Sequence, residues 1–290
     1  MELLSLLFAS LYQFGDAFAF LVLSACGLAV IFGMMGVINL AHGEFIMCGA
    51  YVTVLTARTG LPLPLAMVLG ALTAGIIGML IEYFVIRRLY TRLFDSIVAT
   101  WAISLIATQG MLIVAGPSIE GLKTPFGSFD LAGLSFSWYR ILLPVIALLI
   151  LGGIYWLFMK TPFGVRARAT IQNPSMARAL GVDTDRVYAL TFGLGAALAG
   201  LTGALYAPTM TTVPTMGSAF IVQSFVTVVV GGADVLLGAA PAAAVLAFIQ
   251  SVLTASYGQL IGQVGLLLTV IVVVRVLPKG ISGWMLRGSN

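Results

Sequence analysis

The chain has 290 residues, of which 60% are hydrophobic and only 8% carry a charged side chain, and its formal net charge is +4 at pH 7. Soluble domains carry charge on about a quarter of their residues, so this composition excludes an ordinary soluble domain and indicates that lipid is the solvent. The basic residues gather in a few loops between apolar stretches, which is typical of a membrane topology signal rather than of nucleic-acid binding.

The N-terminal Met1-Glu2-Leu3-Leu4 has neither a basic region nor a small-residue cleavage pattern. We therefore expect no cleaved signal peptide, and a short interfacial or partly inserted helix in its place. Cys26 and Cys48 stand alone in apolar segments, which argues against a disulfide or a metal site. We expect no cofactor.

A helix needs about 20 apolar residues to cross the hydrocarbon core of a bilayer. On this criterion the sequence predicts nine segments: 17–38, 43–57, 62–86, 95–116, 141–159, 187–207, 219–233, 237–257 and 261–277. Segments 43–57, 219–233 and 261–277 are short enough to be broken or re-entrant, so both eight and nine full crossings stay open. The predicted fold class is all-α, a polytopic membrane protein.

The basic residues predict an orientation. One side of the nine-segment arrangement holds most of the 14 Lys and Arg residues, namely Arg87, Arg88, Arg92, Lys160, Arg166, Arg168, Arg178, Arg186, Arg275, Lys279 and Arg287. Only Arg58, Lys123 and Arg140 lie on the opposite side. By the positive-inside rule the crowded side is cytoplasmic, which places the N-terminus outside and the C-terminus inside.

The segments group into two halves within a single transmembrane domain, residues 1–290. A first half (17–116) and a second half (187–277) are separated by a linking segment and loop (141–186). Because one odd helix lies between them, the halves run with inverted topology, as is common in transporters with a path between repeats. Gly195, Ala199 and Gly203 form a small-residue face that favours close helix packing.

Residues 36–45 read Gly-Val-Ile-Asn-Leu-Ala-His-Gly-Glu-Phe and join the first two segments. They hold the only histidine, His42, with Asn39 and Glu44. Burying such groups is costly, so we predict that they line a translocation path or hold a broken helix; a tight turn at the membrane surface is the alternative. Glu44 has a second interpretation as a cap of the helix 45–57. His42 either titrates near neutral pH or is simply hydrogen-bonded.

The positional counterpart of this run in the second half is residues 209–217, which are also short, polar and broken by Gly and Pro. In segment 95–116, Thr100, Ser104 and Thr108 recur every fourth residue with Gln109 beside them. These four are further path candidates, with back-bonding to helix carbonyls as the alternative for the hydroxyls. Near the path only Glu44 and Asp234 offer a charge, and no intramembrane Lys or Arg does.

Two loops carry predicted structure. Loop 116–140 is expected to be external, with a hairpin around residues 126–128, and to act as a lid, a docking surface or a simple connection. In loop 160–186, Asn173 and Pro174 are typical of a helix start, and Gly181 can end the helix in the left-handed conformation. A short capped helix on a basic loop suits docking into a soluble partner.

This loop resembles the coupling loop of ATP-binding-cassette importer permeases, with Ala177 and Gly181 in the place of its recurring Ala-x3-Gly. The run 36–45 closely resembles the signature of the hydrophobic amino acid and amide uptake family. Further matching stretches follow in the family's order at residues 81–82 with 87–90, 161–167, 179–187, 230–232 and 277–280. On this basis the chain is identified as a member of the LivH-type permeases.

The resemblance implies a bacterial inner-membrane importer and its partners: a second permease of the LivM type, two ATPase subunits and an external solute-binding protein. It also implies that Ala177, Arg178 and Gly181 couple the permease to the ATPase. The chain has no Gly-x4-Gly-Lys-[Ser/Thr] motif, so ATP hydrolysis is assigned to the partners and the chain is not expected to be an enzyme. No nucleic-acid partner is expected.

Two solute classes stay open, branched-chain amino acids and urea or short amides. Residues 99–105, 171–173 and 223–225, with Gln109, are more similar to the urea and amide branch, but Gln223 stands where that branch carries Asp. An ion-coupled secondary transporter using Glu44 and His42, and a passive urea or amide channel, are the alternative functions. The sequence shows no pattern typical of an intramembrane enzyme.

Overall fold

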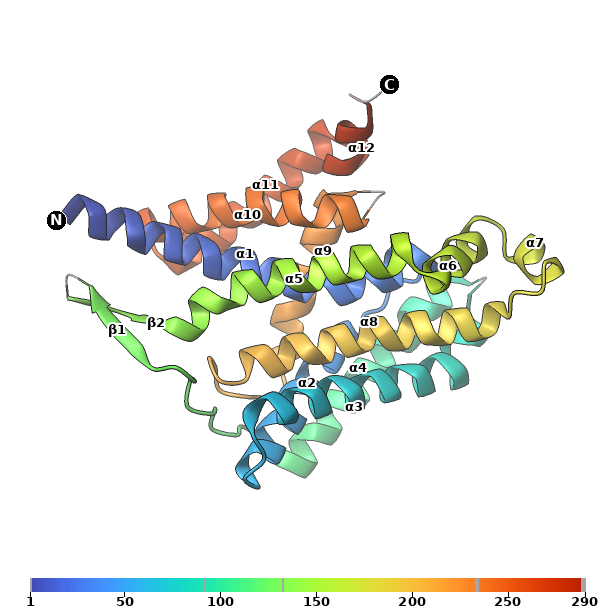
Figure 1. Ribbon diagram of the computed structural model, residues 1–290, viewed down its shortest axis with the longest axis horizontal. Helices are drawn as coiled ribbons and strands as arrows, with labels where there is room; N and C mark the ends of the chain where they lie inside the picture. The colour runs from blue at the N-terminus through green and yellow to red at the C-terminus, as the bar shows by residue number, and fades with distance from the viewer. Residues whose placement is uncertain (1, 91, 132, 233–234, 288–290) are drawn as a thin grey trace. The chain divides into compact units, whose positions relative to one another are not determined.

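The structure is a computed structural model that describes residues 2–90, 92–131, 133–232 and 235–287 (Figure 1). Nearly all of its regular structure is helical. In chain order the elements are α1 (Glu2–Met35), α2 (His42–Arg58), α3 (Leu63–Phe84), the 3-10 turn η1 (Ile86–Arg88), α4 (Leu93–Ala115), β1 (Ser128–Leu131), β2 (Leu134–Ser137), α5 (Trp138–Lys160), α6 (Pro162–Gln172), α7 (Pro174–Ala179), α8 (Thr184–Tyr206), α9 (Met216–Gly231), α10 (Val235–Tyr257), α11 (Gln259–Val276) and α12 (Gly280–Arg287).

The helices confirm the all-α polytopic class. In the described part of the chain, seven stretches are long and apolar enough to span a membrane: Leu7–Met35, Leu63–Arg88, Leu93–Ala115, Trp138–Lys160, Thr184–Tyr206, Gly238–Tyr257 and Gln259–Gly283. The predicted segment 261–277 corresponds to α11, with 18 residues, and lies within the longer spanning stretch Gln259–Gly283. The other two short segments correspond to α2, with 17 residues, and α9, with 16. Each is about 25 Å long at 1.5 Å per residue, less than the hydrocarbon core.

The start of the chain differs from the expected separate interfacial helix. Residues 2–16 continue without interruption into the first spanning segment, so α1 has 34 residues and is about 51 Å long. This length exceeds the thickness of the hydrocarbon core. The predicted segment 17–38 also ends early, because the helix stops at Met35.

The chain forms two compact units, which are described separately. The larger unit comprises residues 26–122 and 152–222, and its core is made by α2, α3 and α8, which pack against one another (Figure 1). Glycines allow the close packing of α2 and α8. A Cβ at Gly49 would lie 2.0 Å from the Gly200 carbonyl oxygen, and a Cβ at Gly203 would lie 1.8 Å from the Ile46 carbonyl oxygen. Larger side chains cannot fit at these positions.

The small-residue face predicted on α8 is present. A Cβ at Gly195 would lie 2.8 Å from the carbonyl oxygen of Gly27 in α1, and Gly27 in turn lies against the Ala199 backbone. Gly203 completes the face by contacting Ile46 in α2. The face therefore packs α8 against both α1 and α2 with their backbones nearly in contact.

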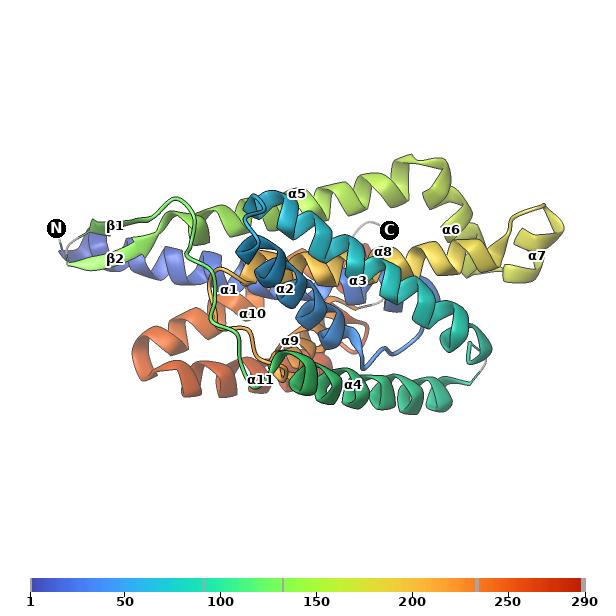
Figure 2. The same cartoon turned by 90° about the horizontal axis from the view of Figure 1, so that it is seen from below.

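The smaller unit comprises residues 1–25, 123–151 and 223–290. In it, the antiparallel hairpin of β1 and β2 lies beside the first turns of α1 (Figure 2). Phe136 packs edge-on against Phe8 and Tyr12, with ring centroids 5.1 and 5.0 Å apart. Arg140 and Asp16 add an ion pair at 2.8 Å. The apolar start of α1 is therefore buried partly by protein.

The predicted hairpin exists, but not at residues 126–128. Phe126 and Gly127 adopt left-handed conformations, with φ of +70° and +66°, and form a turn that precedes β1. The strands pair from Ser128 with Ser137 to Leu131 with Leu134, so the hairpin turn follows Leu131. Phe126 and Gly127 do form a turn, as their residue types indicate. The sequence prediction took this turn for the hairpin turn, which comes one strand later.

Candidate translocation path and coupling site

The run at residues 36–45 forms a break between two helices. After α1, Gly36 has φ of +64°, a left-handed conformation that suits glycine, and its N–H donates to the Phe32 carbonyl at 2.9 Å. The chain then stays non-helical until α2 begins at His42. Within the break the Asn39 side chain accepts a hydrogen bond from the Ala41 N–H at 3.0 Å. The break thus has its own internal hydrogen bonding.

The break at residues 209–217 lies against the first one. α8 ends at Tyr206 and α9 begins at Met216. A Cβ at Gly43 would lie 2.2 Å from the Gly217 carbonyl oxygen, and a Cβ at Gly217 would lie 2.7 Å from the Gly43 carbonyl oxygen. Residues 36–45 and 209–217, which the sequence paired by position alone, therefore end in the first turns of α2 and α9, and these two turns are in contact.

Glu44 lies in the first turn of α2, where the helix dipole favours a carboxylate. It makes no capping hydrogen bond to the backbone, so that part of its predicted role is wrong. Its Oε1 instead accepts a hydrogen bond from the Ser104 hydroxyl of α4 at 2.8 Å, and Thr108 interacts with the same carboxyl group. Glu44 is only 8% exposed, and its Oε2 has no hydrogen-bond partner among the described residues.

Of the predicted polar face of α4, three residues point toward the break. Thr100 is buried, accepts a hydrogen bond from the Leu40 N–H at 3.1 Å and donates to the Ser96 carbonyl at 2.9 Å. It therefore both bonds back to its own helix and anchors the break. Ser104 and Thr108 contact Glu44, whereas Gln109 is exposed and takes no part in these contacts.

The two other candidates of the run are fully buried. Asn39 has an exposed fraction of 0%, and its Nδ2 has no hydrogen-bond partner among the described residues. His42 is equally buried, and its imidazole Cε1 faces Gly27, where a Cβ would lie 2.9 Å away. The structure thus gathers Asn39, His42 and Glu44 in one buried region. Asp234 lies outside the described residues.

A contact that the sequence did not reveal joins the second break to the loop after α4. Ile119 and Thr212 form an antiparallel bridge, with N–H to carbonyl distances of 2.8 and 3.1 Å in the two directions. Beside it, Arg58 at the end of α2 donates to the Glu120 carbonyl at 2.7 Å. No local sequence pattern marks a single bridge between segments some 90 residues apart.

Loop 160–186 holds two helices rather than one. The predicted helix is α7, and the Asn173 side chain caps it by accepting from the Met176 N–H at 3.0 Å. α6 (Pro162–Gln172) was missed, although the Thr161 hydroxyl accepts from the Gly164 N–H at 3.3 Å as an N-cap. The Thr-Pro pair at its start is the sequence signal that could have found it.

The three predicted coupling residues differ in exposure. Ala177 is buried, so its side chain supports α7 from beneath instead of forming its outer surface. Gly181 has φ of +83° and ends the turn after α7 as predicted. Arg178 is exposed and belongs to the ion-pair network described next. The outward-facing apolar side chains of this tip are Met176, 57% exposed, and Leu180, 77% exposed.

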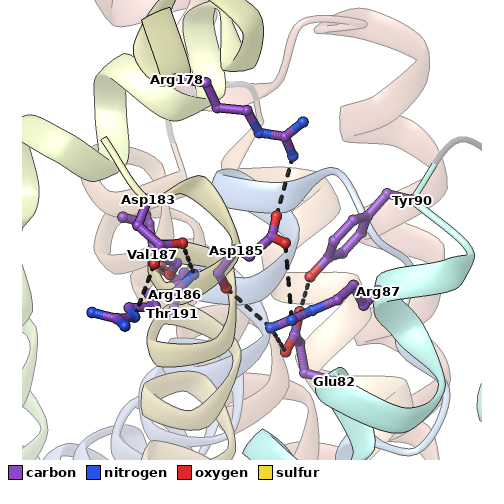
Figure 3. Close-up of polar contacts among 9 residues, drawn as sticks. All are labelled: Glu82, Arg87, Tyr90, Arg178, Asp183, Asp185, Arg186, Val187 and Thr191. Atoms are coloured by element: carbon purple, nitrogen blue, oxygen red, sulfur yellow. Dashed lines mark hydrogen bonds and ion pairs between the residues drawn. The ribbon is translucent and has the colours of Figure 1, made fainter. Parts of the chain in front are cut away.

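A chain of polar contacts links α7 to the end of α3 (Figure 3). Arg178 donates to the Thr184 hydroxyl at 2.6 Å and to the Asp185 carboxylate at 3.1 Å. Arg87 contacts the Asp185 carbonyl at 3.4 Å and its carboxylate at 3.9 Å. Arg87 also pairs at 3.3 Å with Glu82, and the Glu82 side chain is fully buried.

Tyr90 completes the coordination of Glu82, because its hydroxyl donates to the Glu82 carboxylate. Its ring lies 4.8 Å from that of Tyr188 in α8. Burial, and then the hydrogen bond to Glu82, raise the pKa of Tyr90 well above its usual range. Tyr90 is therefore a neutral donor at physiological pH.

Comparison with known proteins decides the family. Residues 12–277 match the family described as branched-chain amino acid transport system, permease component. The chain belongs to this permease family. It is 30% identical over 284 residues to the probable branched-chain amino acid transport permease protein LivH of Methanocaldococcus jannaschii, covering 91% of this chain and 88% of the relative.

Two further relatives agree. The high-affinity branched-chain amino acid transport system permease protein LivH of Escherichia coli K12 is 28% identical over 280 residues, covering 90% of each chain. BraD, the corresponding permease protein of Pseudomonas aeruginosa, is 29% identical over 235 residues, covering 75% of this chain and 76% of the relative. No solved structure matches the chain.

This membership confirms the resemblance drawn from the sequence motifs. The permease is a multi-pass membrane protein of a family that serves branched-chain amino acid transport systems of the ATP-binding-cassette type. As a permease component it is a transport subunit rather than a catalyst. The break, the two helix starts and the coupling loop are thus parts of a transport protein.

Proposed function

We propose that this permease supplies half of the translocation path of an ATP-driven importer. One observation carries the proposal: α8 connects the coupling loop to the buried break. Its first turn contacts Arg178 of α7 through Asp185, and its last turns pack against Ile46 of α2, half a turn from Glu44. Because α8 reaches both sites, docking of a partner on the loop can displace the residues that line the proposed path.

The path residues have different proposed roles. Glu44 Oε2 is a buried acceptor without a partner, and Asn39 Nδ2 is a buried donor without one. An unpaired buried polar group costs about 1–3 kcal/mol, so a state in which these atoms meet solute or water is favoured by that amount. Thr100 holds the break in place, while Ser104 and Thr108 orient Glu44. His42 packs beneath the break.

Gln109 needs a separate role because its side chain is exposed on α4. It reaches the path only where a second permease covers that face. α4 exposes most of its surface and carries large apolar side chains such as Ile113 and Val114 outward, as a subunit interface or a lipid-facing helix does. The proposed partner is a second permease of the LivM type.

The coupling loop faces the cytoplasm in this proposal, which agrees with the crowding of basic residues at that side. The exposed Met176 and Leu180 insert into a groove of an ATPase subunit, with Ala177 supporting the helix and Arg178 fixing its direction. The N-terminus is then external and the C-terminus cytoplasmic. An external solute-binding protein delivers the solute on the opposite side.

The proposed solute is a branched-chain amino acid, with urea or a short amide as the second candidate. The named relatives are branched-chain amino acid permeases, which favours the first. All of these solutes carry N–H groups that can donate a hydrogen bond to Glu44 Oε2. A single carboxylate does not bind a zwitterion at both ends, so we propose that the solute-binding protein sets most of the specificity.

The proposal is tested by purifying the tagged permease from its native membrane and identifying what comes with it. A second permease and ATPase subunits are expected. The complex is then placed in liposomes with its solute-binding protein, and uptake of labelled leucine and of labelled urea is measured with and without ATP. Uptake that requires ATP supports the proposal, and the preferred label identifies the solute class.

Two outcomes contradict it. Uptake by the permease alone, driven by a proton or sodium gradient, would establish an ion-coupled transporter with Glu44 as the coupling group. Uptake by the permease alone without any gradient or ATP would establish a passive channel. Glu44→Gln separates these two, because removing the carboxylate abolishes coupling to protons but leaves passive flux.

A further inference from the structure

We infer that Asp185 is a positioning residue that joins the coupling helix α7 to the α3–α8 pair, so that the three helices move together. The inference rests on the proposed function and adds residues that the sequence analysis did not assign to coupling. It begins from Glu82, whose side chain is fully buried near the end of α3. A buried carboxylate needs a compensating charge, because its desolvation costs several kcal/mol.

Arg87 supplies that charge and is therefore fixed in position. Its guanidinium lies 3.3 and 3.4 Å from the two Glu82 oxygens, and its Cζ lies 4.9 Å from the ring centroid of Tyr83. The Tyr90 hydroxyl holds the same carboxylate. With these contacts the end of α3, the turn η1 and Tyr90 form one anchored cluster.

Asp185 connects this cluster to the loop. Its carbonyl and carboxylate oxygens contact Arg87, and the other carboxylate oxygen contacts Arg178 at 3.1 Å (Figure 3). One carboxylate thus bridges two arginines from different elements. Arg178 is further held by the Thr184 hydroxyl at 2.6 Å, so the end of α7 is tied to the first turn of α8 by two bonds.

The anchored end does not slip, because α3 and α8 pack closely beyond it. A Cβ at Gly78 would lie 2.3 Å from the Ala196 Cβ, and a Cβ at Gly193 would lie 2.4 Å from Met79. A displacement of α7 is therefore passed through Asp185 to two helices at once. Without the Asp185 carboxylate, Arg178 keeps its bond to the Thr184 hydroxyl but loses its link to the residue that contacts Arg87.

The neighbouring Asp183 provides a matched control. It also lies in the loop and also pairs with an arginine, Arg186, at 2.8 Å, and this ion pair and that of Asp185 with Arg178 are both about half or more exposed. Asp183 and Arg186 belong to the same turn, however, so their pair joins no second element. Figure 3 shows this pair on the other side of α8 from Arg87. Asp183→Asn keeps the N-cap acceptor for the Arg186 N–H, since Asn caps as well as Asp.

The experiment compares Asp185→Asn with Asp183→Asn in the complete transporter in liposomes. The measured quantity is solute imported per ATP hydrolysed, together with the ATPase rate with and without the loaded solute-binding protein. For Asp185→Asn we expect that ratio to fall about fivefold or more, the low end of coupling between sites. Asp183→Asn is expected to stay within about twofold of the unaltered protein, because its ion pair with Arg186 lies within one turn and connects no second element.

Rescue distinguishes positioning from folding. Asp185→Glu keeps the carboxylate and is expected to restore most of the ratio, and the amount of assembled complex is expected to be equal for all variants. If Asp185→Asn and Asp183→Asn import the same amount of solute per ATP hydrolysed, and uptake still requires ATP, the role of Asp185 is overturned while the proposed function stands. If the unaltered protein shows no ATP-driven uptake, the proposed function and this inference both fail.

Discussion

Gly43 and Gly217 place the starts of two helices, α2 and α9, in backbone contact. Either glycine would put a new Cβ within 2.7 Å of a carbonyl oxygen of the other. Glu44 follows Gly43 directly, and its Oε1 lies 3.1 Å from the position of a Cβ at Gly217. The contact therefore sets where the buried carboxylate lies, and a side chain at either glycine displaces it.

Replacing Gly43 or Gly217 with Ala is expected to lower the thermal stability of the purified permease in detergent by several degrees, because backbone must move to admit a methyl group. Gly110→Ala in α4 is the control. No atom lies within 4 Å of a Cβ there, and Ala favours a helix over Gly by up to about 1 kcal/mol. Melting temperatures for the Gly43 or Gly217 variant that match the control would contradict the close approach.

Glu44→Gln is expected to be milder than Glu44→Leu. Gln keeps an oxygen that accepts from Ser104, whereas Leu leaves the partly buried Ser104 hydroxyl without its acceptor, at a cost of about 1 kcal/mol, the low end for an unpaired polar group. Thermal unfolding measures the stability, and uptake measures the function. Equal losses of uptake in both variants, with the stability of Glu44→Gln unchanged, would show that transport needs the negative charge and not the hydrogen bond.

Thr100→Val is expected to destabilise the break, since the partly buried Leu40 N–H loses its acceptor, the hydroxyl of the buried Thr100. Thr100→Ser keeps the hydroxyl and is expected to behave like the unaltered protein. Protease sensitivity of the break and uptake kinetics are the two measurements. Normal behaviour of both variants would leave Thr100 with only its bonds to the carbonyls of α4.

Gly181→Asn is expected to be tolerated and Gly181→Val to be harmful. No atom lies within 4 Å of a Cβ at Gly181, so space is not the obstacle, but its φ of +83° costs a β-branched residue about 1–2 kcal/mol and Asn less. The readout is solute-dependent ATPase activity of the assembled transporter. Identical activity of the two variants would exclude the left-handed turn as a requirement for coupling.

Tyr90 predicts a pH dependence. Because the fold raises the pKa of Tyr90, its contribution to stability is fully present below about pH 10, the usual tyrosine pKa, and is lost as the pH rises further. Tyr90→Phe has no hydroxyl to titrate and therefore lacks this pH-dependent contribution to stability. The unaltered protein is therefore expected to lose more stability than Tyr90→Phe between pH 9 and pH 11. Parallel curves would show that the fold does not raise the pKa of Tyr90.

The sequence predicted those features that a local pattern specifies. Nine apolar segments, the N-cap at Asn173 and the left-handed Gly181 depend on residues close together in the chain, and each was found. The Ala-x3-Gly spacing marked loop 160–186 as a candidate coupling loop. A residue spacing does not show which side chains are buried, so the inward direction of Ala177 was not foreseen.

Features that depend on distant segments were missed or misassigned. Glu44 was expected to cap its own helix, yet its hydrogen bond goes to Ser104, 60 residues away. The bridge between Ile119 and Thr212 and the contacts of Asp185 with two arginines are likewise set by packing. The exposed Gln109 differs from Thr108 by only one position, a rotation of about 100° on a helix.

The glycine contacts between α2 and α8 also fix the register of these two helices. Gly49 meets Gly200 and Ile46 meets Gly203, two contacts one helical turn apart on antiparallel helices. Sliding α8 by one residue would place the side chain of Ala199 or Leu201 where only a hydrogen atom fits. Longitudinal sliding of α8 against α2 is therefore blocked, so we expect these two helices to keep their register when the permease changes conformation.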